Sequence, residues 1–399
     1  MLYWIYEQWD AAFRAGESWA QTFKFLNLLY YITFRAALAA IFSFTLSLVL
    51  GPKVIRKLIS MKVGQPIRSA EEVHKLAELH GGKAGTPTMG GVLILGTVLL
   101  TVLICGRPLN PFVAVTTCVM LALGLLGFVD DYTKVIKKDS AGVSARQKLF
   151  WQFVIGLIAA CFIYFKKEVS GFGAVAGELE SMGYRMKDAG HIDVSSVGFP
   201  LFKHPIIPSL GLLAIPFFII ISVGCSNAVN LTDGLDGLAT GCTITVALAY
   251  GVIAYLAGSA TLGLEYLNIP FNPLLSELSV FMMALVGAGM GFLWFNCHPA
   301  KVFMGDTGSL AIGGALATAA ICTKQELLLV IIGGVFVMEA MSVILQVGSF
   351  KLRGKRIFAM SPIHHHFELR GWHESQVIIR FWILSVVLAM GGLALIKIL

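Results

Sequence analysis

The feature that most constrains this chain is a series of apolar runs, each about 18 to 22 residues long, that recur from residue 28 onward. A run of that length crosses a bilayer as a helix, because only helices and closed barrels satisfy their backbone hydrogen bonds in hydrocarbon. Hydrophobic residues make up 57% of the 399 residues and charged residues only 13%, which is more apolar sequence than a soluble core buries. The sequence therefore predicts an all-α polytopic membrane protein.

About ten membrane-spanning helices are expected, separated by charged or glycine-rich stretches. They are placed at 28–50, 88–105, 111–129, 148–165, 209–229, 236–258, 277–296, 308–323, 327–348 and 377–397. Residues 28–399 are thus interpreted as one integral-membrane domain. The preceding segment, 1–27, is rich in Trp and Tyr and is interpreted as an interfacial segment on the outer surface.

Positive charge in the connecting loops predicts the orientation. The loops 51–87, 130–148, 230–236, 297–307 and 349–376 hold 18 Lys and Arg, whereas the other connections and both tails hold 10. Because Lys and Arg accumulate on the cytoplasmic side, we expect the first set there, and both termini and the insertion 166–208 on the periplasmic side. The net charge of +7 comes largely from these loops, without interleaved exposed aromatics, so no nucleic-acid partner is expected.

Adjacent carboxylates mark the cytoplasmic end of the third span, in "VDDYTKVIKK". Asp130 and Asp131 raise each other's proton affinity unless a cation lies beside them. Mg2+ prefers carboxylate oxygens together with substrate phosphates, and Lys134 follows the pair closely. The motif favours a magnesium-diphosphate site, although two acids followed by lysines also occur in ordinary juxtamembrane loops.

Three further cytoplasmic motifs carry polar residues. In "SNAVNLTDGLDGLATG", Asn227, Asn230, Asp233 and Asp236 recur every three residues, and a break at Gly234 and Gly237 would allow the two aspartates to converge. In "FNCHPAKVFMGDTGSLAIGG", Asp306 precedes the eighth span and is interpreted as a metal ligand or a helix cap. In "HGGKAGTPTMGG", Lys83 contacts phosphate or is simply a cytoplasmic lysine. Glu339, in the middle of the ninth span, is either functional or a structural partner for a neighbouring helix.

These motifs, with "SPIHHHFE" at 361–368, resemble in order those of the phospho-N-acetylmuramoyl-pentapeptide transferases, within the polyprenyl-phosphate N-acetylhexosamine-1-phosphate transferases. The resemblance covers about residues 28–399. It implies that UDP-MurNAc-pentapeptide and undecaprenyl phosphate give lipid I and UMP with Mg2+. It further implies a homodimer in the bacterial cytoplasmic (inner) membrane.

The resemblance also suggests roles for individual residues. Asp306 is expected to be the principal Mg2+ ligand and Asp130 to accept a proton from, or orient, the lipid phosphate, with Asp131 and Asp233 supporting the metal. Lys134 and Lys148 would hold phosphate or carrier lipid. The predicted substrate-binding residues are Lys83, Thr88, Asn227, Asn230, Asp233, Leu235, Asp236, Asn296, Phe303, Gln346 and His365. Phe303 is expected to lie against the uracil.

Consecutive side chains point in different directions in regular structure, so His364, His365 and His366 are unsuited to sharing one zinc ion. We interpret them as donors to phosphate oxygens, with His364 at the reaction centre, His365 on substrate and His366 structural. Two alternatives remain at this point. One is a sibling transferase that uses UDP-GlcNAc, and the other is an ion-coupled secondary transporter, whose sites usually lie nearer the midplane.

Overall fold

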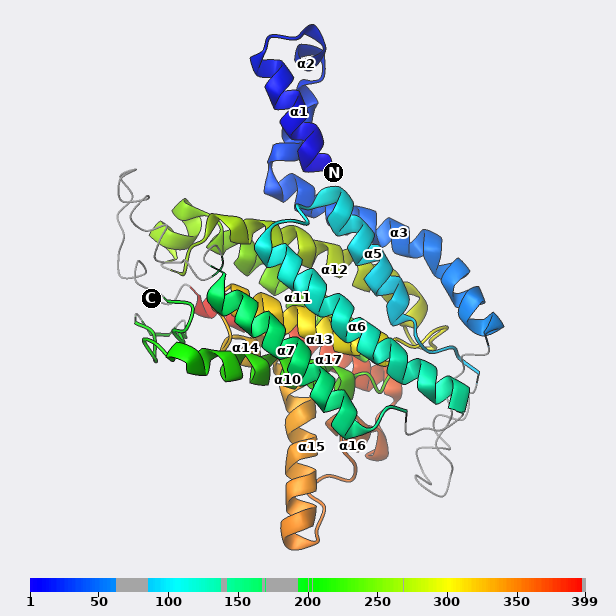
Figure 1. The fold of residues 1–399 in the computed structure, drawn as a ribbon. Coiled ribbons are helices and arrows are strands. Elements are labelled where there is room, and N and C mark those ends of the chain that lie inside the picture. Colours follow the sequence, from blue (N-terminus) through cyan, green and yellow to red (C-terminus); the bar gives the residue numbers. More distant parts are fainter. Residues whose placement is uncertain are drawn as a thin grey trace.

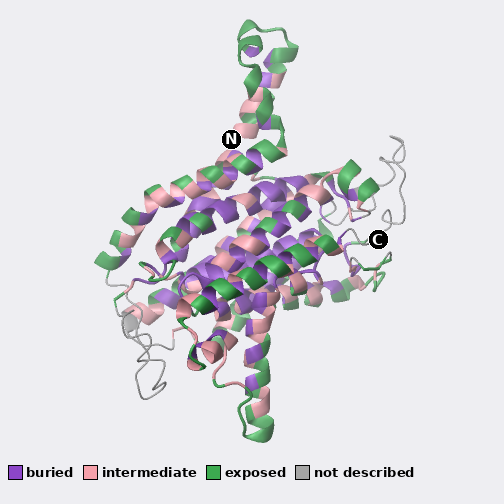
Figure 2. Cartoon of the chain, turned by 180° about the vertical axis from the view of Figure 1, so that it is seen from behind, coloured by how far each residue is buried: buried purple, intermediate pink, exposed green. Residues whose placement is uncertain are grey.

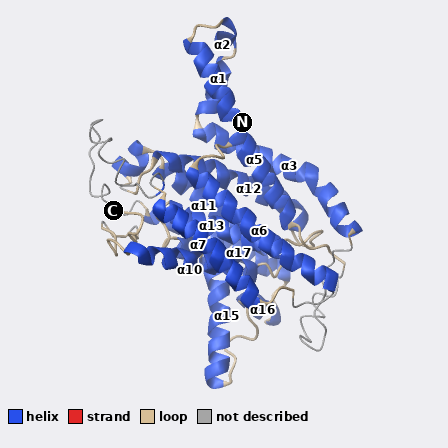
Figure 3. Cartoon of the chain, viewed as in Figure 1, coloured by secondary structure: helices blue, strands red, loops and turns tan. Residues whose placement is uncertain are grey.

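The computed structural model describes residues 1–61, 85–137, 142–166, 169, 193–199, 201–202, 204–267 and 269–396. Across this part of the chain the protein is almost entirely helical (Figures 1 and 3). An isolated antiparallel bridge joins Val197 and Ile207. The predicted all-α class is confirmed.

Ten helices of the bundle correspond to the ten predicted spans. They are α3 (Ile32–Ser60), α5 (Gly91–Cys105), α6 (Pro111–Lys137), α7 (Ala145–Phe165), α10 (Ala214–Thr232), α11 (Leu238–Ala257), α12 (Ser276–Asn296), α13 (Gly305–Cys322), α15 (Gly334–Arg353) and α17 (Glu374–Leu395). Eight described helical segments are long and apolar enough to cross a membrane. The two others are α5, which is shorter, and α13, which is diluted by small and polar residues. A polytopic membrane protein is confirmed, and ten crossings stay a prediction.

Short helices complete the described fold. They are α1 (Leu2–Arg14), α2 (Ser18–Thr22), η1 (Lys24–Tyr30), η4 (Gly211–Leu213), η5 (Ala260–Tyr266), η6 (Pro273–Leu275), α14 (Leu329–Ile332) and α16 (Ile363–Leu369). The span expected without interruption at 327–348 is divided at Gly333, where α14 ends and α15 begins. Two consecutive glycines lower helix propensity at that point, which accounts for the break.

The bundle is built around α13, whose residues are all buried from Thr307 to Cys322. Figure 1 shows α13 in the middle of the bundle, with α1 and α2 projecting on one side and α15 on the opposite side. Buried residues are concentrated in this centre (Figure 2). The many Gly and Ala residues of α13 allow neighbouring helices to approach closely, which bulky side chains would prevent.

Two glycines bring the start of α13 against its neighbours. A Cβ on Gly127 of α6 would lie 2.1 Å from the carbonyl oxygen of Asp306, and one on Gly91 of α5 would lie 2.2 Å from the amide nitrogen of Gly308. Any side chain at either position would push α13 away. These contacts place Asp306 beside the end of α6, where Asp130 and Asp131 lie.

A buried ion pair joins the N-terminal ends of α3 and α12. The guanidinium of Arg35 binds both carboxylate oxygens of Glu277, with Nη1–Oε2 at 2.8 Å and Nη2–Oε1 at 2.5 Å. The Tyr3 ring of α1 lies 5.0 Å from the Arg35 guanidinium carbon and 4.3 Å from that of Arg107. The N-terminal segment is therefore attached to the bundle at this end.

Candidate active site

The centre of the site is the carboxylate of Asp306 in the first turn of α13. Its Oδ2 lies 2.5 Å from Nζ of Lys148 in α7 and 3.1 Å from Nζ of Lys134 in α6. Both lysines also approach Oδ2 of Asp130, at 2.8 Å for Lys134 and 3.5 Å for Lys148. Two ammonium groups thus lie beside two carboxylates, which compensates the cost of partly burying four charges.

Asp131 points at the N-terminus of α13. It accepts hydrogen bonds from the backbone N–H groups of Asp306 at 3.2 Å and Thr307 at 3.0 Å, and from the Thr307 hydroxyl at 2.8 Å. The first N–H groups of a helix have no partner within the helix, and a negative charge there is favourable. Asp131 therefore fixes the position and direction of Asp306.

The asparagines of α10 face different neighbours. Asn230 donates to Oδ1 of Asp306 at 2.7 Å and to the Ser309 hydroxyl at 2.8 Å, so it belongs to the site. Asn227, one turn earlier, donates to Gln152 of α7 at 3.0 Å. Asn227 thus connects α10 to α7 and does not contact Asp306 directly. The role of Gln152 was not predicted, because an isolated glutamine in an apolar run carries no pattern.

Asp233 and Asp306 differ in their electrostatic surroundings. Burial, together with the nearby carboxylates of Asp306 and Asp131, raises the pKa of Asp233 to about 8. Burial also acts to raise the pKa of Asp306, but a hydrogen bond with Asp130 and the two ammonium groups outweigh it and lower that pKa. The ionised form of Asp306 is therefore favoured at neutral pH, whereas the protonated form of Asp233 is favoured. A cation bound near Asp233 would shift it toward the ionised form.

The glycine-rich loop before α5 runs beside the segment before α13. Phe303 donates its N–H to Pro87 at 2.8 Å, and Gly90 donates to the Phe303 carbonyl at 2.8 Å. Thr88 is buried, and its hydroxyl lies 2.8 Å from where a Cβ of Gly305 would be. Lys83 lies outside the described residues. The predicted Thr88 and Phe303 are thus held next to Asp306.

Two more predicted residues hold loops through their amides. Asn296 donates to the carbonyl of Val302 at 2.9 Å and accepts from Thr240 at 2.8 Å. Gln346 donates to the Phe358 carbonyl and accepts from the N–H groups of Ile357 and Phe358, each at 2.9 Å. Leu235 is buried. These groups shape the loops around the site.

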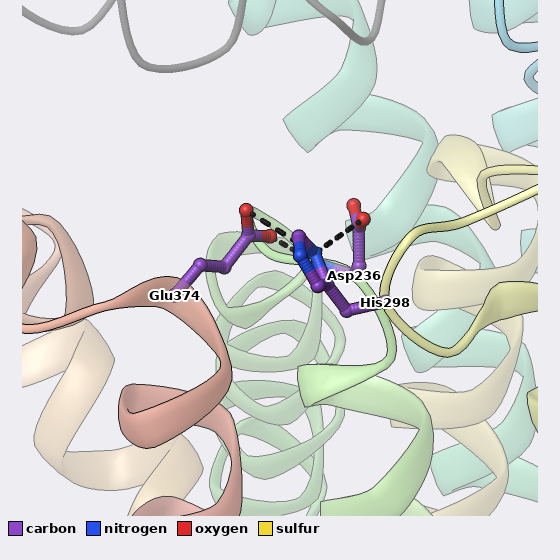
Figure 4. Close-up of side chains that lie close together, drawn as sticks. All are labelled: Asp236, His298 and Glu374. Atoms are coloured by element: carbon purple, nitrogen blue, oxygen red, sulfur yellow. Dashed lines mark hydrogen bonds and ion pairs between the residues drawn. The ribbon is translucent and has the colours of Figure 1, made fainter.

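Asp236, His298 and Glu374 form a second cluster of polar side chains, as Figure 4 shows. Asp236 contacts the other two. Its Oδ2 lies 3.1 Å from Nδ1 of His298 and accepts the Ala300 N–H at 3.0 Å. Glu374, the first residue of α17, accepts the Asp236 N–H at 3.1 Å and lies 3.5 Å from the same His298 nitrogen. His298 and Glu374 were missed by sequence reasoning, because neither one lies in a recurrent acid spacing. They join α17 and the 297–304 loop to the Asp236 turn.

The three histidines of α16 have separate partners. His364 is fully buried, and its Nδ1 lies 3.1 Å from Oε2 of Glu339 in α15. His365 Nδ1 lies 2.8 Å from Oε2 of Glu368. His366 Nδ1 accepts the N–H of Ala359 at 3.0 Å. The three imidazoles thus contact three different segments: α15, α16 itself and the loop before α16.

The donor atoms of Asp130, Asp131 and Asp306 all lie within 4.8 Å of one another. They are carboxylate oxygens, the donor type that Mg2+ takes together with substrate phosphates. The lysines already paired with these groups suit phosphate oxygens as well. The residues present therefore fit a hard divalent cation and a phosphate group in the same place.

Fold and site together define a polytopic membrane protein with a cluster of carboxylates and lysines at the ends of its helices, whose groups suit a divalent cation and a phosphate. Comparison with known proteins narrows this class. Residues 113–324 match the sequence model of glycosyl transferase family 4, and residues 83–95 match signature 1 of the phospho-N-acetylmuramoyl-pentapeptide-transferases. A protein of that name from Methylacidiphilum infernorum (isolate V4) is 51% identical over 373 residues, covering 94% of this chain and 96% of the relative. The chain belongs to the phospho-N-acetylmuramoyl-pentapeptide-transferase family.

Proposed function

We propose that this protein transfers phospho-MurNAc-pentapeptide from UDP-MurNAc-pentapeptide to undecaprenyl phosphate, giving lipid I and UMP. The observation that carries the proposal is the Asp306 carboxylate, held between Lys134 and Lys148 and beside Asp130, in a chain of this family. The reaction joins two anionic substrates, so the protein has to position them and neutralise their charge. The proposed location is the cytoplasmic face of the bacterial inner membrane.

Asp306 is the proposed principal ligand of Mg2+, with Asp130 beside it and with Asp131 and Asp233 in support. When bound, Mg2+ would neutralise charge on the diphosphate of the sugar nucleotide. Asp131 contributes mainly by fixing the start of α13, because both of its oxygens accept hydrogen bonds from that helix end. A cation bound nearby would favour the ionised form of the Asp233 carboxyl group.

The lipid phosphate is proposed to bind on the lysine side of the cluster. Lys134 and Lys148 are partly exposed, with 26% and 16% of their side chains accessible, so a phosphate oxygen can reach both ammonium groups. Asp130 lies between them and is positioned to accept the proton of that phosphate or to orient it. The attacking oxygen would then face the diphosphate held at Asp306.

The nucleotide is proposed to bind along the turn 233–237 and the facing 296–304 segment. Asp236, Leu235 and Asn296 form one side of this region, and Phe303 is the proposed stacking surface for uracil. Thr88, Asn230, His364, His365 and Gln346 complete the cleft in the proposal. Lys83 and Asn227 remain proposed contacts from family resemblance alone.

The direct test is UMP release by purified protein supplied with undecaprenyl phosphate, UDP-MurNAc-pentapeptide and Mg2+. We expect Asp306→Ala to abolish release while leaving the thermal unfolding midpoint in detergent near that of the wild type. UDP-GlcNAc in excess is the substrate control, and it should not compete. Wild-type protein that turns over UDP-GlcNAc in preference would replace this function with that of the sibling transferases.

Asp130→Asn tests the role of the base. It should lower turnover far more than it lowers nucleotide affinity, because the proposed contact is to the lipid phosphate. Equal losses of turnover and affinity would assign Asp130 to substrate binding.

A homodimer is also proposed, and light scattering of the detergent-purified protein would test it.

A further inference from the structure

Glu339 and His364 form a buried pair behind the proposed active site. Glu339 lies in α15 with none of its surface exposed, and His364 lies in α16 with none exposed. Oε2 of Glu339 is 3.1 Å from Nδ1 of His364. Although these two atoms are within ion-pair distance, they lack hydrogen-bond geometry, and in the described part of the chain neither Glu339 oxygen and neither His364 nitrogen has a hydrogen-bond partner. Each group is therefore left with the other as its polar neighbour.

Burying such groups without a full set of partners is costly, so packing alone gives no reason to keep a carboxylate at this position. An apolar residue would fill the same space in α15 at lower cost. Glu339 also lies well inside the apolar sequence of α15, where an acid is expensive. The pair therefore calls for an explanation beyond stability.

The Nε2 edge of the His364 ring packs against the 233–237 turn of the proposed active site. A Cβ on Gly234 would lie 2.4 Å from Nε2 of His364, so only glycine permits this contact. Gly234 lies between Asp233 and Asp236, the carboxylates proposed for metal and nucleotide binding. The ring of His365 packs on the other side of His364, with centroids 4.1 Å apart. The imidazole is thus enclosed between α15 and the turn.

We propose that Glu339 is a positioning residue for the transfer reaction: it orients the imidazole of His364, which in turn holds the 233–237 turn in place. This inference rests on the proposed function. A carboxylate beside Nδ1 favours the tautomer with hydrogen on that nitrogen and holds the ring plane, as carboxylates do for working histidines in other sites. The membrane helix α15 thereby sets the geometry of a cytoplasmic loop.

The test is a double-mutant cycle on kcat/KM for UMP release, with Glu339→Leu, His364→Ala and the double variant. Glu339→Leu should lower kcat/KM by about 10- to 100-fold, the usual cost of losing an orienting partner. The double variant should match His364→Ala within about twofold, because Glu339 acts only through that ring. Glu339→Gln keeps the volume and one acceptor oxygen, so it should retain more activity than Glu339→Leu.

Ser342→Ala is the matched control, because Ser342 is buried in the same helix and its hydroxyl bonds the backbone carbonyl of Glu339. It should leave kcat/KM near that of the wild type, alone and combined with His364→Ala. Losses for Glu339→Leu and His364→Ala that multiply in the double variant would overturn the positioning role, as would full activity in both Glu339 variants. Wild-type protein that fails to release UMP would instead overturn the proposed function, and this inference with it.

Discussion

Nζ of Lys148 in the first turn of α7 lies 2.5 Å from Oδ2 of Asp306 in the first turn of α13, although 158 positions separate the two residues. Ser144 caps α7 by accepting the N–H of Gln147, which starts that helix where Lys148 reaches the cluster. The ammonium group of Lys148 therefore neutralises part of the negative charge of Asp130 and Asp306. A metal ion has to share or displace this charge when it binds.

Replacing Lys148 should separate metal binding from phosphate binding. In Lys148→Ala the Asp306 carboxylate loses a competing cation, so half-maximal activation should need the same Mg2+ concentration or less. Maximal turnover should fall by about 100-fold or more, because the lipid phosphate loses a charged donor. UMP release measured across a Mg2+ titration checks both values, with Lys148→Arg as the charge-preserving control. A raised Mg2+ requirement at full maximal rate would assign Lys148 to the metal site instead.

Asp233 should make stability depend on pH. Burial raises its pKa in the folded protein to about 8, above the ordinary value of 3.8, so the fold favours the protonated carboxyl. That contribution is fully present below the unfolded pKa and is lost as pH rises through the folded pKa. In EDTA, Asp233→Asn should therefore gain thermal stability relative to the wild type as pH rises from about 5 to about 9.

Added Mg2+ should reduce this gain, since a nearby cation favours the ionised carboxylate that Asn lacks. The measurement is the difference between the two unfolding midpoints in detergent at each pH, with and without Mg2+. A difference that does not change with pH would show that Asp233 has an ordinary pKa in the fold.

His298 and Glu374 should affect nucleotide binding more than chemistry. Both contact Asp236: Nδ1 of His298 lies 3.1 Å from its Oδ2, and Oε1 of Glu374 accepts its backbone N–H at 3.1 Å. His298→Ala or Glu374→Gln should raise KM for the sugar nucleotide by about tenfold, equivalent to about 1.4 kcal/mol, with kcat little changed. Initial-rate kinetics measure both, and His204→Ala, at an exposed position, is the control. A fall in kcat at unchanged KM would contradict the assignment.

Glu277 should contribute to stability but not to turnover. Its removal leaves the Arg35 charge buried without its partner, because the two side chains are only 1% and 5% exposed. Glu277→Ala should cost about 3–5 kcal/mol in the free energy of unfolding, and replacing both residues by Met and Leu should recover most of it. Unfolding in detergent gives these values. The kcat of the folded fraction should stay constant, because α5 separates this pair from the acid cluster by about 20 Å.

Helix positions were largely predictable, but helix ends were not. The third span was expected to end at residue 129, yet α6 continues to Lys137. The two additional turns carry Asp130 and Lys134 on one face, because residues four apart are neighbours on a helix. Nζ of Lys134 lies 2.8 Å from Oδ2 of Asp130. Hydropathy shows where the apolar sequence stops, and a helix can extend into water beyond that point.

The composition of the Asp130, Asp131 and Asp306 cluster was predictable from its motifs, because carboxylates at the ends of apolar spans are uncommon. The orientation of each member was not. Asp131 caps α13, Asn227 turns toward Gln152, and the contacts of Asp236 with His298 and Glu374 were not predicted. These features depend on contacts between loops that lie far apart along the chain.

Local composition was enough to predict a bundle of membrane helices with acids and lysines at helix ends, because bilayer thickness and the cost of buried charge act on each segment separately. Which acid meets which lysine, and which histidine faces Glu339, emerged only from the folded chain. Those pairings follow from helix packing, in which Gly127 and Gly91 permit close approach to α13. No local property of the sequence specifies that approach, because it depends on the shapes of both helices at once.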